Sequence, residues 1–460
     1  MTRVQAVIVC EKKWPSSTVQ SRKVFRAVGV GWSDGFMIEM TISRRKMLST
    51  AVGAGVVLTS TKLFGALPAL LQPNIQRFDI EVSDAEIELL KERLRAPRWP
   101  IDTPGEAWAY GTDLDYLQEL VNYWKEEYDW RLHEKDLNSY NHYTTTVDGQ
   151  PLHFVHERGV DANNALPLLM THGWPGTVWE MLPSVRMLSR PETFGGDRAE
   201  AFNVVVPSIP GFGFSGPPAV GTDIARTGDL WVELMEKLGY ERFGAYGSDW
   251  GAGITRYLGA RYPDRVVGIH TPGAPPSQGR DPRTDEERDY LRRSELWSID
   301  ETGYQRIQGT KPQTLAFGLT DSPVGLAAWI TEKLRSWSDC DGDVENRFSK
   351  DQILTLVSIY WFTRTIGTSV RFYYENGLGS SRGRNRPSPW SRDVQVPQGF
   401  AQFVGIPARS GPPRSLIQEP AANVAHWSVF HTGGHFPAIE EPRLLVADLR
   451  TFFSPLRRSE

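Results

Sequence analysis

A carboxylate in a glycine-rich turn is the side chain of this sequence best placed for covalent chemistry. The turn reads Gly247-Ser248-Asp249-Trp250-Gly251. A turn of this form between a strand and a helix holds its central side chain clear of the sheet, in a strained left-handed backbone conformation. The Asp249 carboxylate is ionised at neutral pH and can attack a saturated carbon that bears a leaving group, which gives an ester that water must cleave. Epoxides and alkyl halides are substrates of this kind.

The same pentapeptide is also compatible with an ordinary glycine-rich turn that ends in a helix-capping aspartate. Its flanks favour the functional interpretation. Residues 242–246 predict a short buried strand, and residues 252–261 predict a helix whose N-terminus can hold a negative charge. Ser248 does not occupy the centre of the turn, which argues against a serine-type esterase.

Two further motifs stand at the ends of predicted strands. The first, His172-Gly173-Trp174-Pro175-Gly176, follows a strand over residues 168–171. The backbone N–H groups of Trp174 and Trp250 can together form an oxyanion hole, whereas we interpret His172 as a structural hydrogen-bonding residue. The second motif carries His435 on a Gly-Gly loop after a strand over residues 424–430, where a base could deprotonate the attacking water.

The elements that must position these motifs alternate between strands and helices. This rhythm predicts a parallel sheet with crossover helices, whose active site lies at the carboxyl ends of the strands. N-terminal to this region of alternating strands and helices, Asp148-Gly149 is expected to join two strands of a hairpin. We further expect strands at 142–147, 151–157, 202–206, 266–270 and 398–404, and an extended segment at 77–82. A helix that Ser83 caps and Pro97 stops should follow this segment, with further helices from about 113 through 128 and at 442–453.

The alternation of strands and helices is interrupted between about Pro272 and Pro397. Polar and helical segments there, such as residues 322–334 and 351–362, predict a cap over the sheet. Aromatic side chains of the cap would wall an apolar pocket. Epoxide opening releases an alkoxide that needs a proton, which a phenol in the cap could supply. The 15 tyrosines leave the choice of that phenol open at this point.

Composition bounds the remaining classes of function. The 460 residues are 40% hydrophobic and 23% charged with a net charge of -4, and no basic stripe suggests nucleic acid as a partner. Cys10 and Cys340 offer no disulfide framework, and the nine histidines show no metal-ligand spacing. We therefore expect no cofactor and no metal. The oligomeric state, including a homo-oligomer, stays open.

The N-terminal region resembles a twin-arginine export signal. Arg44-Arg45 precede a mildly apolar run over residues 49–58 that is too short to span a bilayer. We expect residues 37–70 to be the signal, residues 1–36 to be a non-native upstream extension, and the mature protein to be exported without a stable membrane span. A basic N-terminal arm on a cytoplasmic protein is the alternative.

From about residue 73 to 455 the chain resembles epoxide hydrolases of the microsomal and juvenile-hormone type, within the α/β-hydrolase superfamily. Arg98-Trp99-Pro100 and the segment 114–124 resemble that family's N-terminal domain. The resemblance implies an α/β-hydrolase fold with a helical cap insertion and an N-terminal wrapping segment. The implied domains are the N-terminal domain at 73–165, the hydrolase core at 166–271 and 397–456, and the cap at 272–396.

The resemblance also assigns roles to individual residues. It implies Asp249 as nucleophile, His435 as general base, and Tyr304 and Tyr373 as the phenols that assist ring opening. The implied reaction converts a small hydrophobic epoxide and water to a vicinal diol. A haloalkane dehalogenase that uses the same aspartate, and a catalytically impaired binder of hydrophobic ligands, are the alternatives; the two tyrosines argue against the first.

One position departs from the family pattern. The family carries Glu or Asp just after the strand that here ends near Val404, where it supports the histidine. The matching position falls near Ile406, and no acid occurs from Val394 through Gln418. We do not transfer the role to Glu419, the nearest acid downstream. The departure predicts slow hydrolysis of the ester, because ring opening by Asp249 does not need the acid.

Overall fold

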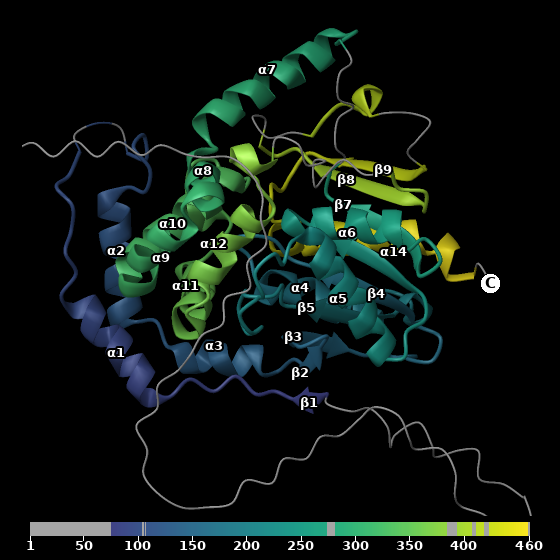
Figure 1. Cartoon of the computed structure of the whole chain (residues 1–460), viewed down its shortest axis with the longest axis horizontal. Helices are drawn as coiled ribbons and strands as arrows, with labels where there is room; N and C mark the ends of the chain where they lie inside the picture. The colour runs from purple at the N-terminus through teal and green to yellow at the C-terminus, as the bar shows by residue number, and fades with distance from the viewer. Residues whose placement is uncertain are drawn as a thin grey trace, which may run out of the picture. The chain divides into compact units, whose positions relative to one another are not determined.

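The computed structural model describes residues 75–103, 105, 107–273, 281–383, 393–406, 411–417 and 423–458. The predicted signal, the upstream extension, Cys10 and Glu419 lie outside the described residues. Within them, nine strands form one sheet in the order β1-β2-β3-β5-β4-β6-β7-β8-β9 (Figure 1). The strands are β1 (Gln76–Arg77), β2 (His142–Val147), β3 (Gln150–Glu157), β4 (Leu166–Thr171), β5 (Phe202–Pro207), β6 (Phe243–Gly247), β7 (Val266–Thr271), β8 (Gln398–Phe403) and β9 (Val424–Phe430).

The sheet combines an antiparallel edge with a parallel centre. Neighbouring strands from β5 to β9 are parallel, as predicted, whereas β1, β2 and β3 pair antiparallel with their neighbours. The predicted hairpin between β2 and β3 is confirmed. Asp148 and Gly149 both have positive φ, 43° and 77°, which matches the twist of a two-residue hairpin turn.

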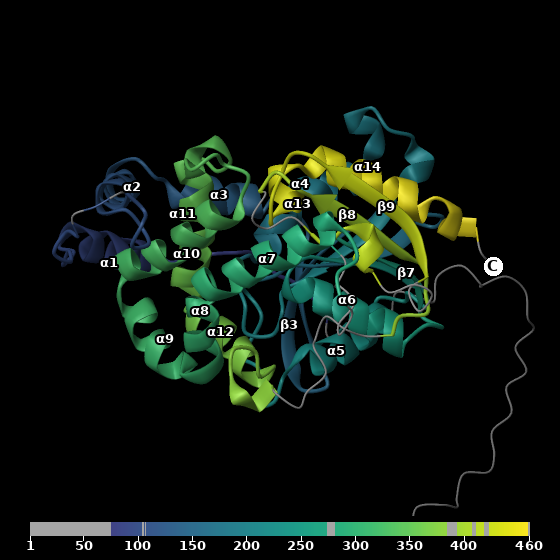
Figure 2. The ribbon, with the colours of Figure 1, turned by 90° about the horizontal axis from the view of Figure 1, so that it is seen from above.

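Helices cover both faces of the parallel strands (Figure 2). On one face, α4 (Val178–Ser189) packs against β3, β4 and β5, and α14 (Pro442–Phe453) packs against β7, β8 and β9. On the other face, α6 (Trp250–Arg261) packs against β4, β6 and β7, beside α5 (Ile224–Lys237). Strands β5, β6 and β7 are buried along their whole length because both of their faces are covered.

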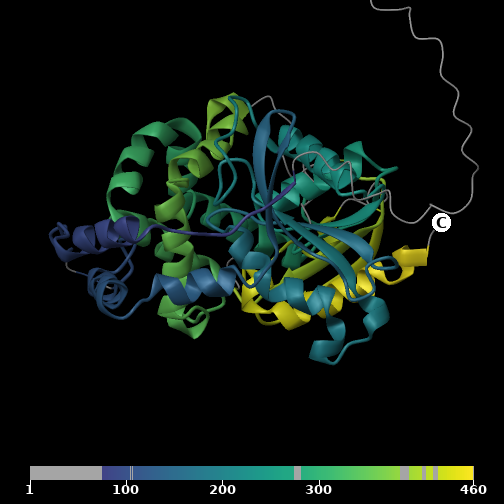
Figure 3. The same ribbon diagram turned by 90° about the horizontal axis from the view of Figure 1, so that it is seen from below.

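The N-terminal helices lie beside the cap rather than on the sheet (Figure 3). These helices are α1 (Asp84–Arg95), α2 (Leu114–Glu126) and α3 (Trp130–Leu137). α1 and α2 contact α10, and α2 and α3 contact α11. The cap comprises α7 (Asp285–Asp300), α8 (Gly303–Thr310), α9 (Pro312–Asp321), α10 (Pro323–Trp337), α11 (Lys350–Thr363) and α12 (Ile366–Glu375). A short helix α13 (Pro437–Glu440) precedes α14.

The segment 77–82 pairs less than the sequence suggests. Only Gln76 and Arg77 form strand pairs, with β2. Further along, Ile80 N donates to Asn138 Oδ1 at 2.8 Å and Val82 N donates to Glu134 Oε1 at 2.7 Å. Side chains of the region around α3 thus replace the sheet ladder. None of the described helices combines the length and apolar character needed to cross a membrane.

Candidate active site

Asp249 sits at the turn between β6 and α6 with φ 49° and ψ −122°, a strained conformation for a residue with a side chain. The flanking glycines are required by close backbone approach. A Cβ at Gly247 would lie 2.2 Å from Gly251 O, and one at Gly251 would lie 2.0 Å from Thr171 O. The turn packs backbone to backbone against the end of β4, so the local sequence fixes where the carboxylate stands.

Two neighbouring loops meet the Asp249 carboxylate. Thr171 and Gly247 are level in the pairing of β4 with β6, which brings the Trp174 loop to the elbow. Trp174 N donates to Asp249 Oδ1 at 3.0 Å, and Trp250 N also donates to this carboxylate. His435 Nε2 lies 3.3 Å from Asp249 Oδ2. The predicted pair of N–H donors and the predicted histidine therefore converge on the predicted nucleophile.

Electrostatics keep Asp249 ionised. Burial alone raises the pKa of its carboxyl, but the hydrogen bond from His435, the charge of His435 and the N–H groups of Trp174 and Trp250 outweigh burial and lower the pKa below its ordinary value. The side chain retains 17% of its surface exposed, and that of His435 retains 13%. An ionised and partly accessible carboxylate is able to act as a nucleophile.

The two predicted phenols lie together above the N–H donors. Tyr304 on α8 stacks on Trp174, with ring centroids 5.5 Å apart and planes 9° apart. Tyr373 on α12 meets Trp250 edge to face at 4.7 Å, and the two phenol rings are 5.8 Å apart and hydrogen-bonded. Burial, with the nearby Tyr304 and Asp249, raises the pKa of Tyr373 well above its usual value. This phenol stays protonated at neutral pH.

Helix α10 contributes two site residues that the sequence did not single out. The Trp337 ring lies 5.0 Å from the His435 ring and 5.1 Å from the Tyr304 ring. The buried Lys333 places Nζ 4.8 Å from the centre of the Tyr304 ring, a cation–π contact. Both residues share one helix face with Ile330, a spacing that predicts packing and does not by itself indicate a site.

A buried carboxyl group lies behind the elbow and was also missed. Glu180 on α4 is 3% exposed, and its Oε1 accepts from Ser248 Oγ at 3.0 Å. The backbone N–H of Gly173 also binds this carboxyl group. Burial, with the charges of Asp249 and Glu440, raises the pKa of Glu180 to about 8. Glu180 thus joins the elbow to the Trp174 loop as a neutral acid at pH 7.

His172 has the structural environment that we expected. Its Nδ1 donates to Gly173 O at 2.9 Å, and its Nε2 accepts from Ile209 N at 3.2 Å. Burial lowers the pKa of this ring to about 4, so it is neutral at pH 7. His172 therefore fixes the start of the Trp174 loop.

Ile406 lies where the sequence placed the departure from the family pattern. Its Cδ1 would be 2.7 Å from a Cβ at Gly434, directly beside the loop that carries His435. A cavity of about 90 Å³ borders Ile406, Gly434 and His435. In the part of the chain that the structure describes, no group of three or more His, Cys, Asp or Glu side chains is arranged to hold a metal ion.

Comparison with known proteins decides the family. The model "Epoxide hydrolase N terminus" matches residues 75–181, and the model "alpha/beta hydrolase fold" matches residues 167–329. Epoxide hydrolase 1 of Sus scrofa is 33% identical over 92% of this chain and 97% of its own length. This chain belongs to the epoxide hydrolase family. It is therefore a hydrolase that acts on ether bonds.

Solved structures agree with the fold of this epoxide hydrolase. The juvenile hormone epoxide hydrolase of the silkworm Bombyx mori superimposes with a TM-score of 0.75 at 31% identity, over 85% of this chain and 97% of that one. The Aspergillus niger epoxide hydrolase gives a TM-score of 0.72 at 27% identity, over 83% and 96%. The predicted α/β-hydrolase fold and the predicted family resemblance are confirmed.

Proposed function

We propose that this epoxide hydrolase converts an apolar epoxide and water to a vicinal diol through an ester on Asp249. The geometry of the Asp249 carboxylate is the observation that carries the proposal. Oδ1 accepts from Trp174 N, whereas Oδ2 lies 3.3 Å from His435 Nε2. Oδ1 is then the future carbonyl oxygen, and Oδ2 is the oxygen that attacks.

In the first step, Asp249 Oδ2 attacks one ring carbon and the C–O bond of the epoxide breaks, with its electrons moving to oxygen. Tyr373, assisted by Tyr304, donates a proton to this oxygen, which becomes the first hydroxyl group. Tyr373 lies within hydrogen-bonding reach of Tyr304 and carries its proton at neutral pH, as a proton donor must. A phenol that is protonated at neutral pH can still protonate an alkoxide, because an alkoxide is the stronger base.

In the second step, His435 takes a proton from water, and the water oxygen attacks Cγ of Asp249. Negative charge develops on Oδ1, where the N–H groups of Trp174 and Trp250 stabilise it. The bond between Cγ and the ester oxygen then breaks. The former Oδ2 leaves as the second hydroxyl group of the diol with the proton that His435 holds, and the remaining proton of the water returns to the Tyr373 phenolate. Asp249 regains its carboxylate with one oxygen from water.

The side chains around the carboxylate support an apolar substrate. Two indoles and two phenols, namely Trp174, Trp250, Tyr304 and Tyr373, pack against one another beside the N–H donors of the carboxylate. Such a wall binds hydrocarbon groups and excludes water. The paired phenols favour an epoxide over a haloalkane, because a halide leaves without a proton.

Export is a second element of the proposal and rests on the Arg44-Arg45 signal alone. Removal of the signal would leave a mature chain that begins near residue 70. N-terminal sequencing of protein secreted by the source cell tests this directly. Retention of the arginine pair would contradict export.

Turnover of styrene oxide by wild type and by Asp249→Ala tests the reaction. We expect diol formation by the wild type and none above the uncatalysed rate by the variant, because the substitution removes the carboxylate on which the ester forms. Asp229→Asn is the matched control, since Asp229 binds the hydroxyl groups of Tyr257 and Tyr262. Wild-type rates in Asp249→Ala would contradict the proposal. Halide release from haloalkanes without epoxide turnover would instead support a haloalkane dehalogenase.

A further inference from the structure

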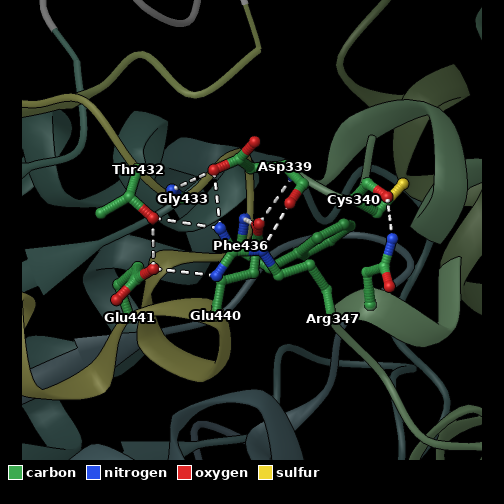
Figure 4. Close-up of polar contacts among 9 residues, drawn as sticks. Asp339, Cys340, Arg347, Thr432, Gly433, Phe436, Glu440 and Glu441 are labelled. Atoms are coloured by element: carbon green, nitrogen blue, oxygen red, sulfur yellow. Dashed lines mark hydrogen bonds and ion pairs between the residues drawn. The ribbon is translucent and has the colours of Figure 1, made fainter. Parts of the chain in front are cut away.

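The cap segment that follows α10 lies against the loop that carries His435 (Figure 4). His435 N donates to Trp337 O at 2.8 Å, and Gly433 N donates to Asp339 Oδ2 at 2.9 Å. A Cβ at Gly434 would lie 2.7 Å from Trp337 O, so the two backbones pack without space for a side chain. The position of the histidine loop thus depends on a segment of the cap.

Arg347 ties this contact together, as Figure 4 shows. Its Nη2 donates to Asp339 Oδ2 at 2.7 Å and to Thr432 Oγ1 at 3.0 Å, and its Nε donates to Asp339 O. Its Nη1 donates to Glu441 Oε1 at 2.9 Å. Charged, forked hydrogen bonds of this kind are stronger and more directional than neutral ones. One guanidinium group therefore binds the cap segment, the histidine loop and the start of α14.

Glu440 holds the same loop from its other end. Its Oε1 accepts from Phe436 N at 2.8 Å, and its Oε2 accepts from Asp339 N at 2.9 Å. On one side of His435, Gly433 thus binds the Asp339 carboxylate. On the other side, Phe436 binds the Glu440 carboxylate, which also binds Asp339 N. The cavity of about 90 Å³ beside His435 gives this loop room to shift if these bonds are lost.

The bonds that fix the nucleophile come from other elements. Asp249 is held by backbone N–H groups of the Trp174 loop and of α6. Among the described residues, the hydrogen bonds of Asp339 and Arg347 join them to each other, to the histidine loop and to Glu440 and Glu441, and not to those two elements. Loss of the Asp339–Arg347 pair would move His435 relative to Asp249, because only the histidine side of their 3.3 Å contact depends on this pair.

We propose that Asp339 and Arg347 are positioning residues that place His435 for ester hydrolysis and have little influence on ring opening. The inference rests on the proposed function, since it assigns the two residues to the second half-reaction. It predicts that a segment of the cap controls the rate of ester hydrolysis through the position of His435.

Rapid-quench kinetics with intact-protein mass tests the inference on the full chain, with styrene oxide as substrate. In Arg347→Gln and Asp339→Asn we expect the ester to form within about twofold of the wild-type rate and to decay at least tenfold more slowly. In the steady state, kcat and KM then fall together while kcat/KM changes little. A purely structural defect would instead lower the amount of active enzyme.

Two further variants make the result decisive. Arg335→Gln is the matched control, because Arg335 lies on α10 and donates to Gly342 O at 2.8 Å; we expect both steps to be unchanged. Arg347→Lys keeps the charge and loses the fork, and we expect slower ester decay in it even if Arg347→Gln does not fold.

Ester decay at the wild-type rate, or equal slowing of both steps, would overturn the inference. Absence of any ester in His435→Ala, in which decay is blocked, would instead contradict the proposed function.

Discussion

Glu180 gives the sharpest prediction about stability, because its carboxyl group is buried behind the nucleophile elbow. The pKa of this group rises from 4.5 to about 8, first through burial and then through the charges of Asp249 and Glu440. The unfolded chain loses the Glu180 proton above about pH 4.5, whereas the folded chain keeps it to about pH 8. The folded state therefore binds more protons in this window, and stability falls as the pH rises.

The size of the effect follows from the shift. Each pH unit inside the window lowers the folding equilibrium constant about tenfold, which sums to about 5 kcal/mol across the window as an upper limit. Gln is nearly isosteric with the neutral acid, can accept from Ser248 Oγ and does not titrate. Glu180→Gln should thus gain stability relative to wild type with each unit between pH 5 and pH 8, while the two proteins differ little at pH 5.

Urea unfolding of both proteins at pH 5, 6, 7 and 8 measures this difference. Comparison of two chains that differ at one residue cancels the titration of every group that does not interact with Glu180. Glu236→Gln is the matched control for the loss of one carboxyl group, because the Glu236 side chain is 74% exposed. Parallel pH profiles of wild type and Glu180→Gln would refute the reasoning and would mean that Glu180 is ionised in the folded protein.

Two other predictions concern ring opening and the hairpin. Tyr373→Phe and Tyr304→Phe should slow ester formation on Asp249, by about 100-fold for Tyr373, and leave ester decay unchanged, since each loses a phenol used only in the first step. Single-turnover mass spectrometry measures both steps. A selective effect on ester decay would contradict the prediction. Gly149→Ala should lower the free energy of unfolding, measured in urea, by about 1 kcal/mol, because Gly149 has φ 77°. Gly318→Ala on α9 is the control and should not destabilise the protein, since a Cβ there meets open space. Equal effects of the two substitutions would contradict the hairpin argument.

Much of the fold and of the candidate site could be predicted from short-range patterns. The glycine spacing around Asp249, the hairpin at Asp148-Gly149 and the helix N-cap formed by Ser83 each have a local physical cause, and the structure has all three. Position after a strand was enough to bring the Trp174 and His435 loops to one sheet edge, because the carboxyl ends of parallel strands lie together.

Contacts between distant segments could not be predicted in this way. Asp339 binds Gly433 across 94 residues of sequence, and Glu180 binds Ser248 across 68. Their neighbours in the chain give no sign of either partner. Helix α3 was missed for another reason: at eight residues it is too short to show a clear period. The slow ester hydrolysis expected from Ile406 stays a prediction.

A single turnover in ¹⁸O-labelled water tests the central claim, a covalent ester on Asp249, most directly. With enzyme in excess over styrene oxide, the account predicts that ¹⁸O enters the peptide containing Asp249 and that the diol formed in this first turnover carries none. Label in the diol but not in that peptide would mean that water attacks the epoxide directly, and would contradict the account.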